Sequence, residues 1–280
     1  MFIKGDYMNI LLTNDDGINS IGLIKLKEIL KKYGTVYTVA PQVEQSGKAC
    51  SISAFKGVKV NKIDEYNIAV EGTPVDCVEV AFAMLGINID LVVSGCNNGY
   101  NLSNDIMYSG TCGACVQASM AKIPSIAFSC KNKYFFDMID EYVPSILEFV
   151  FSNNLIDCKY FLNVNIPEKV INGIMLTKVY EPVYETYYRG ELNEDGTYTI
   201  YRDKISVDNY ENSDINAISK GFISITPLSQ TIFKNKYFNE VEEKLNKWQK
   251  LIVYHFFKWY TFIIEMNGWW LSLWIITSVI

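Results

Sequence analysis

An acidic doublet follows an apolar run near the start of the chain. Residues 9–17 read NILLTNDDG, so Asp15 and Asp16 come directly after the apolar residues 10–12 and Thr13. Adjacent carboxylates repel each other, and in a poorly solvated place this repulsion raises one pKa or requires a cation. The doublet therefore predicts a position that is open to water or holds a metal ion.

Two further polar segments follow expected strands in the same way. Ser46 lies in the loop after residues 36–40, and Asn97 lies in the loop after residues 90–95. In doubly wound sheets, ligands bind beyond the carboxyl ends of the strands. Carboxylates together with neutral oxygen donors suit Mg²⁺, Mn²⁺ or Ca²⁺. We therefore expect these loops to converge around a divalent cation, with Ser46 and Asn97 adding neutral oxygens to the two carboxylates.

A fourth polar segment, Ser109-Gly110-Thr111, opens a helix of small residues. A helix N-terminus offers amide and hydroxyl groups to an anion. A cation beside such an anion site favours phosphoryl chemistry, in which the metal polarises the phosphate and activates a water. Taken singly, each of these motifs also fits an ordinary turn or helix cap, so the interpretation depends on their joint placement at successive strand ends.

The composition narrows the classes of function. The chain has 280 residues, a net charge of −6 and a pI of about 5.0, so a nucleic-acid polymer is not expected as a partner. The single histidine, His255, lies near the C-terminus, which argues against catalytic triads and multi-histidine zinc sites. The seven cysteines suggest free thiols in a reducing compartment such as the cytoplasm. We interpret the CxxC motif of Cys112 and Cys115 as small residues packed on a helix.

The order of the elements predicts a Rossmann-like α/β/α core with a mainly parallel sheet. Apolar runs of strand length alternate with helical spacing from residue 10 to residue 166, which is typical of parallel sheets with helices on both faces. Gly34 is expected to end the first helix as its C′ residue. Residues 58–63 and 67–70 are expected to pair as β segments.

The second part of the chain has a different composition. Residues 180–202 are rich in Tyr, Glu and Thr and contain a turn at 193–196, which predicts a projecting β-hairpin. Such an arm favours a role in oligomer contacts over a role in catalysis. Residues 222–226 then resume a core strand. The apolar tail 251–280 contains four of the five tryptophans but is interrupted by Lys258 and Glu265.

Three interpretations of this tail stay open: a weak membrane anchor, a packed or partner-contacting segment, and an end foreign to the ancestral domain. The abrupt change of composition after residue 250 favours the last, so membrane association is not expected.

Several short segments of the sequence resemble those of the SurE family of survival-protein nucleotidases, in the same order and with similar spacing. They are TNDDGINSIG (13–22), VAPQVEQSG (39–47), EGTPVDCV (71–78), DLVVSGCNNGYN (90–101), YSGTCGA (108–114) and GFISITPL (221–228). The resemblance covers roughly residues 8–250, and it implies one nucleotidase domain there, with the hairpin arm at about 180–202 and the atypical tail at 251–280.

The resemblance implies a 5′-nucleotidase, a phosphoric monoester hydrolase that acts on nucleoside 5′- and 3′-monophosphates with one Mg²⁺ or Mn²⁺ ion. The family's metal ligands map onto Asp15, Asp16, Ser46 and Asn97. Asn97, Asn101 and the segment Ser109, Gly110 and Thr111 would lie near the phosphate. Asp15 or Asp16 would orient or deprotonate the attacking water, or, as an alternative, would itself attack the phosphorus to form an aspartyl-phosphate. The resemblance also implies a cytoplasmic homodimer or homotetramer that exchanges its hairpin and C-terminal segment.

A second class of function stays open, namely a non-catalytic nucleotide- or phosphate-binding module. A receiver domain, which also carries an acidic pair after its first strand, is excluded, because residues 55–60 contain no phosphoacceptor aspartate.

Overall fold

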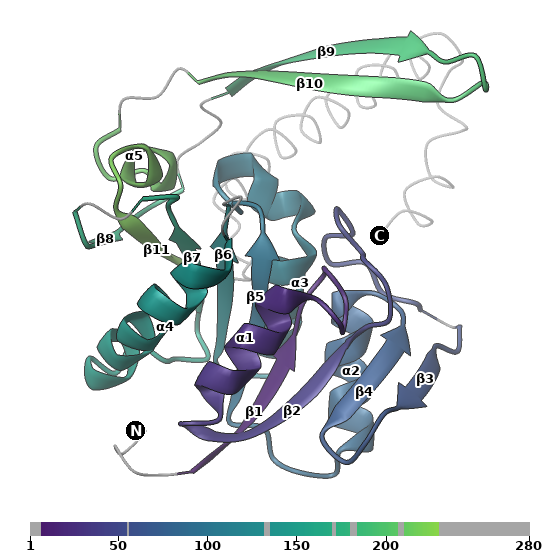
Figure 1. Ribbon diagram of the computed structural model, residues 1–280, viewed down its shortest axis with the longest axis vertical. Coiled ribbons are helices and arrows are strands. Elements are labelled where there is room, and N and C mark those ends of the chain that lie inside the picture. The colour runs from purple at the N-terminus through teal and green to yellow at the C-terminus, as the bar shows by residue number, and fades with distance from the viewer. Residues whose placement is uncertain are drawn as a thin grey trace, which may run out of the picture. The chain divides into compact units, whose positions relative to one another are not determined.

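The computed structural model describes residues 7–54, 56–131, 135–169, 172–179, 184–206 and 210–229 (Figure 1). The helices are α1 (Ile21–Leu30), α2 (Pro74–Met84), α3 (Gly110–Met120), α4 (Phe135–Ser152), α5 (Asp214–Ser219) and the short 3-10 helix η1 (Ser103–Tyr108). The strands are β1 (Met8–Thr13), β2 (Gly34–Pro41), β3 (Lys59–Lys62), β4 (Asn67–Glu71), β5 (Leu91–Asn98), β6 (Ser125–Cys130), β7 (Phe161–Ile166), β8 (Ile174–Leu176), β9 (Tyr184–Leu192), β10 (Tyr198–Ser206) and β11 (Ile223–Leu228).

A large, mostly parallel sheet forms the centre of the fold. Within the described residues, nine strands pair in the order β3-β4-β2-β1-β5-β6-β7-β11-β8. Neighbouring strands are parallel except for β3 with β4 and β7 with β11, which are antiparallel. This confirms the predicted α/β class with a mainly parallel sheet.

Helices cover both faces of this sheet. Helices α1 and α4 pack together on one face, and α2 and α3 pack together on the other (Figure 1). In β1, Ile10 and Leu12 belong to the core under α1 and α4, whereas Leu11 belongs to the core under α2 and α3. The apolar run at residues 10–12 is therefore continuous because successive strand side chains point to opposite faces and both faces are covered.

The predicted hairpin forms, with slightly different bounds. Strands β9 and β10 pair antiparallel from Tyr184 with Ser206 to Leu192 with Tyr198. The turn between them is closed by a bond from the Asn193 N–H to the Thr197 carbonyl, and Gly196 adopts a positive φ of 82°. The first four residues of the predicted range, 180–183, lie outside the described residues.

One sequence expectation about a glycine is wrong. Helix α1 ends at Leu30 with Lys31 as its C-cap, and Gly34 is the first residue of β2 rather than a helix-ending residue. A Cβ atom at Gly34 would lie 1.9 Å from the Met8 carbonyl oxygen, its neighbour in β1. Gly34 is therefore explained by the close approach of two backbones.

The apolar tail at 251–280 lies outside the described residues, so the interpretations of it and the predicted domain limit near residue 250 stay predictions. No helix in the described part of the chain is both long enough and apolar enough to cross a membrane.

Candidate active site

The end of β1 is shaped by Asn14, which lies next to the acidic doublet. Its Nδ2 donates to the Gly17 carbonyl over 3.0 Å and to the Ser20 hydroxyl over 2.7 Å, and its Oδ1 accepts from the Gly17 N–H over 3.2 Å. Gly17 has a φ of 100°, which favours glycine. The buried Asn14 amide thus fixes the turn that presents Asp15 and Asp16 beyond the strand.

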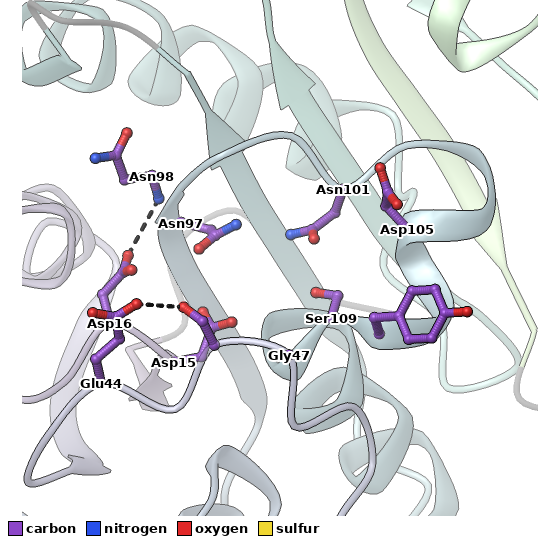
Figure 2. A pocket seen from close by; sticks show the side chains of 11 residues that line it. Asp15, Asp16, Glu44, Gly47, Asn97, Asn98, Asn101, Asp105 and Ser109 are labelled. Carbon is purple, nitrogen blue, oxygen red and sulfur yellow. Dashed lines mark hydrogen bonds between the residues drawn. The ribbon is translucent and has the colours of Figure 1, made fainter. Parts of the chain in front are cut away.

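A polar pocket of about 430 Å³ lies at this edge of the sheet. It is formed by the end of β1, the loop after β2, the end of β5 and the segment that leads through η1 into α3 (Figure 2). Its lining residues are Asp15, Asp16, Glu44, Ser46, Gly47, Asn97, Asn98, Asn101, Asp105, Tyr108 and Ser109.

Most residues that the sequence nominated line this pocket. Of the eight, six are among the lining residues: Asp15, Asp16, Ser46, Asn97, Asn101 and Ser109. The other two, Gly110 and Thr111, lie against Asp15. A Cβ atom at Gly110 would lie 3.1 Å from the Asp15 Cβ, and the fully buried Thr111 donates its hydroxyl to Asp15 Oδ1 over 2.6 Å.

Sequence reasoning did not single out five of the lining residues, namely Glu44, Gly47, Asn98, Asp105 and Tyr108. Glu44 accepts a hydrogen bond from the Ser46 hydroxyl over 2.7 Å, and the Asn98 N–H donates to Asp16 Oδ2 over 3.2 Å (Figure 2). The sequence offered one signal for Glu44 and Asn98: each lies in a polar loop close to a predicted site residue, Ser46 or Asn97.

The pocket is strongly acidic. Among the lining residues that the structure describes, four carry carboxylates and none is lysine or arginine. Burial raises the pKa of Asp15 despite the hydrogen bond from Thr111. Burial, together with the neighbouring Asp15 charge, raises the pKa of Asp16 to about 6. The charged doublet is therefore disfavoured as the structure stands, which is the condition under which a bound cation stabilises a carboxylate pair.

The residue that precedes α3 borders the same pocket. Ser109 is the N-cap, and its Oγ accepts from the Cys112 N–H over 3.0 Å. Further along the helix, a Cβ atom at Gly113 would lie 2.2 Å from the Ala49 carbonyl oxygen. The small residue therefore lets the loop that carries Ser46 lie directly against α3.

The Ser46 loop is also tied to the start of α2 by Asp76. Oδ1 of Asp76 accepts from the Ser53 N–H over 2.7 Å, and Oδ2 accepts from the Ser53 hydroxyl and the Thr73 N–H, each over 2.8 Å. Thr73 in turn donates its hydroxyl to the Ser51 carbonyl over 2.6 Å. The segment EGTPVD (71–76) thus supplies Thr73 and Asp76 to a hydrogen-bond network that anchors a loop of the pocket.

The two cysteines of the CxxC motif are packed inside the fold. Cys112 and Cys115 are buried in α3 and are free thiols, as the sequence interpretation expected. Within the described parts of the chain, no three histidine, cysteine or acidic side chains come together as a metal-binding group.

Comparison with known proteins gives consistent matches. A model of the family described as survival protein SurE matches residues 10–186. The 5′-nucleotidase SurE of Clostridium botulinum strain Langeland is 36% identical over 249 residues, covering 84% of this chain and 98% of that protein. The 5′/3′-nucleotidase SurE of Wigglesworthia glossinidia brevipalpis is 36% identical over 255 residues, covering 87% of this chain and 100% of that protein.

A solved structure also matches. The crystal structure of the SurE protein from Aquifex aeolicus superposes with a TM-score of 0.74 at 33% sequence identity, covering 84% of this chain and 98% of that chain. The similarity thus extends over most of this chain and nearly the full length of each of these relatives.

Proposed function

This chain belongs to the survival protein SurE family, and we propose that its acidic pocket is the active site of a divalent-metal-dependent 5′-nucleotidase. The relatives above carry the names 5′-nucleotidase and 5′/3′-nucleotidase, and they are similar to this chain along nearly their whole length. The proposed reaction hydrolyses nucleoside 5′-monophosphates, and also 3′-monophosphates, to a nucleoside and phosphate.

The observation that carries the proposal is the acidic doublet with a raised pKa in a pocket whose described lining residues include no basic side chain. A phosphate monoester is an anion, so four carboxylates would repel it. A divalent cation removes this conflict, because it neutralises the carboxylates and attracts the phosphate. The pocket then suits a phosphorylated substrate only in its metal-bound form.

The donor set of the pocket fits one Mg²⁺ or Mn²⁺ ion. We assign its ligands to Asp15, Asp16, Ser46 and Asn97, which are hard oxygen donors of the kind that these ions prefer. Two carboxylates and two neutral oxygens leave coordination positions for water and substrate. When bound, the ion supplies positive charge to the phosphate and lowers the pKa of water.

The side chains of the pocket then divide the remaining tasks. Asn101 and the N-terminus of α3 at Ser109 and Gly110 hold the phosphate oxygens and stabilise the charge that develops on them. Asp15 or Asp16 orients the attacking water and accepts its proton. The Thr111 hydroxyl keeps Asp15 in place through its hydrogen bond.

The wider assignments follow from the family and the composition. We propose a cytoplasmic enzyme, since all seven cysteines are free thiols. We further propose a homodimer or homotetramer in which the hairpin of β9 and β10 contacts a neighbouring subunit.

Phosphate release from AMP tests the proposed function directly. Release in the presence of Mn²⁺ that stops on addition of EDTA supports a metal-dependent nucleotidase. AMP binding without phosphate release would instead indicate the non-catalytic module. Asp90→Asn serves as a control, because Asp90 precedes β5 at the opposite end of the strand from Asn97 and accepts from the Asn9 N–H.

A further inference from the structure

Strand β7 places two asparagine side chains inside the fold. Asn163 and Asn165 are both 0% exposed, and because strand side chains alternate, they lie on the same face of β7. On the opposite face, Leu162, Val164 and Ile166 belong to the apolar core. Burying an amide is unfavourable unless its polar atoms are hydrogen-bonded, so the partners of these two side chains indicate their purpose.

Both side chains bind the backbone of one residue of the pocket. The Asn101 N–H donates to Asn165 Oδ1 over 2.9 Å. The Asn101 carbonyl accepts from Asn163 Nδ2 over 2.8 Å and from Asn165 Nδ2 over 3.1 Å. Both the N–H and the carbonyl of Asn101 are thus hydrogen-bonded to side chains of β7, a strand more than sixty residues away in sequence.

The Asn101 side chain is held as well. Its Nδ2 donates to the Ser129 hydroxyl on β6 over 2.8 Å. Asn101 lines the pocket, and Figure 2 shows its amide pointing toward that of Asn97, which lies near the end of β5 (Leu91–Asn98). Two neighbouring strands, β6 and β7, therefore fix the orientation of this amide at the place where the phosphate is proposed to bind.

We propose that Asn163 and Asn165 are positioning residues for the nucleotidase reaction, which act by holding Asn101 in the geometry that binds the phosphate. This inference rests on the proposed function of the pocket. Asn165 has the larger role, because it satisfies both the N–H and the carbonyl of Asn101, whereas loss of Asn163 leaves one donor to that carbonyl in place.

The first arm of the test compares single variants by their steady-state kinetics with AMP and Mn²⁺. Asn165→Leu is expected to lower kcat/KM by roughly 10- to 100-fold, because small displacements of a substrate-binding group have effects of this size. Asn163→Leu is expected to lower it less. Ser224→Ala is the matched control: Ser224 is a buried residue of the neighbouring β11, and its hydroxyl bonds to those of Thr177 and Thr226. Ser224 pairs with Asn165 in the sheet, but its hydroxyl bonds elsewhere, so Ser224→Ala is expected to leave kcat/KM unchanged.

The second arm separates positioning from a general structural role. If Asn165 acts through Asn101, then Asn165→Leu in an Asn101→Ala background is expected to change kcat/KM by less than about 3-fold, since the two residues then share one effect. An equal loss in both backgrounds would overturn the proposal, and so would an Asn165→Leu variant with full activity.

A milder variant covers the case in which Asn165→Leu does not fold. Ser129→Ala removes the partner of the Asn101 side chain, and its loss of kcat/KM is likewise expected to vanish in the Asn101→Ala background. If the wild-type protein releases no phosphate, the proposed function fails. The same single and double variants are then compared by the dissociation constant of AMP in the presence of Mn²⁺. Positioning is then supported by weaker AMP binding that depends on Asn101, and overturned by unchanged binding or by the absence of AMP binding to the wild type.

Discussion

The Thr111 hydroxyl donates a hydrogen bond of 2.6 Å to Oδ1 of Asp15, and it joins the first turn of α3 to the end of β1. The bond engages one oxygen of the carboxylate and restricts its rotation. It also opposes the effect of burial, which raises the pKa of Asp15. Thr111 therefore supports Asp15 through this hydrogen bond and is not among the residues that line the pocket.

Replacement of Thr111 is expected to make the reaction more sensitive to acid. In Thr111→Val, the pKa of Asp15 rises further, so protons compete more strongly with the metal ion. The acid limb of kcat/KM with Mn²⁺ is expected to move upward by on the order of one pH unit, because a hydrogen bond to a charged group contributes roughly 1.5 kcal/mol or more. Thr111→Ser keeps the hydroxyl and is expected to keep the wild-type profile. Identical profiles for the valine and serine variants would contradict this role.

The raised pKa of Asp16 predicts how metal-free stability depends on pH. Because its folded pKa of about 6 lies above the ordinary value of 3.8, its contribution to stability is present below pH 3.8 and is lost as the pH rises through about 6. In EDTA, Asp16→Asn is therefore expected to match the wild-type Tm near pH 4 and to exceed it above pH 7. A shift of a few degrees is expected, since about 1 kcal/mol changes the Tm of a domain of this size by roughly 2–4 °C.

With Mn²⁺ present, the order is expected to reverse, because only the wild type gains stability from the ion. Asp16→Asn is also expected to lose metal-dependent hydrolysis of p-nitrophenyl phosphate while keeping its fold by circular dichroism. Thermal unfolding in both buffers checks these expectations. Near-normal turnover in Asp16→Asn would remove the assignment of this residue to the metal site.

Asp76 is expected to stabilise the Ser46 loop as a charged group. Burial alone would raise its pKa, but the hydrogen bonds from Ser53 and Thr73 outweigh burial and lower it. Its contribution to stability is therefore present above pH 3.8 and lost as the pH falls through its lower folded pKa. Asp76→Ala is expected to cost roughly 2–3 kcal/mol of unfolding free energy at neutral pH, because it leaves buried donors unpaired.

Urea denaturation at pH 7 and pH 3 measures this contribution for Asp76. The exposed Glu79 on the same helix provides the control Glu79→Ala, which is expected to be close to wild type. A loss in Asp76→Ala that is the same at both pH values would show that the Asp76 charge plays no part.

Gly113 is expected to set the distance between α3 and the Ser46 loop. Gly113→Ala places a methyl group 2.2 Å from the Ala49 carbonyl oxygen, so the loop and the helix must separate. The expected cost is about 1–3 kcal/mol, as for other overpacked sites, together with weaker Mn²⁺ binding. Gly57→Ala is the control, since its Cβ would meet no atom within 4 Å. Unchanged Mn²⁺ affinity in Gly113→Ala by calorimetric titration would show that this contact does not shape the pocket.

The architecture was predictable from the sequence where it depended on local pattern. The apolar runs gave the central strands, and the turn residues at 193–196 gave the hairpin. The helix α5 and the strand β8 were missed, because each is short and carries too few periods for its pattern to stand out. The antiparallel pairing of β11 with β7 was also not predicted, since residue types do not record strand direction.

The pocket was predictable to the extent that it follows from topology. Carboxyl ends of parallel strands meet at one edge, and this brought Asp15, Ser46 and Asn97 to a single pocket. Contacts over long sequence separations were not predictable in the same way. The bond of Thr111 to Asp15 was not predicted, and Asn165 carries no local signal of its bond to Asn101.

The most direct test of the account locates the metal ion itself. Crystals grown with MnCl₂ and measured at the manganese absorption edge are expected to show an anomalous peak in the pocket, about 2.0–2.6 Å from carboxylate oxygens of both Asp15 and Asp16. The peak is expected to disappear in crystals of Asp16→Asn. A manganese peak only at another place in the molecule, in protein that still releases phosphate from AMP, would contradict the account.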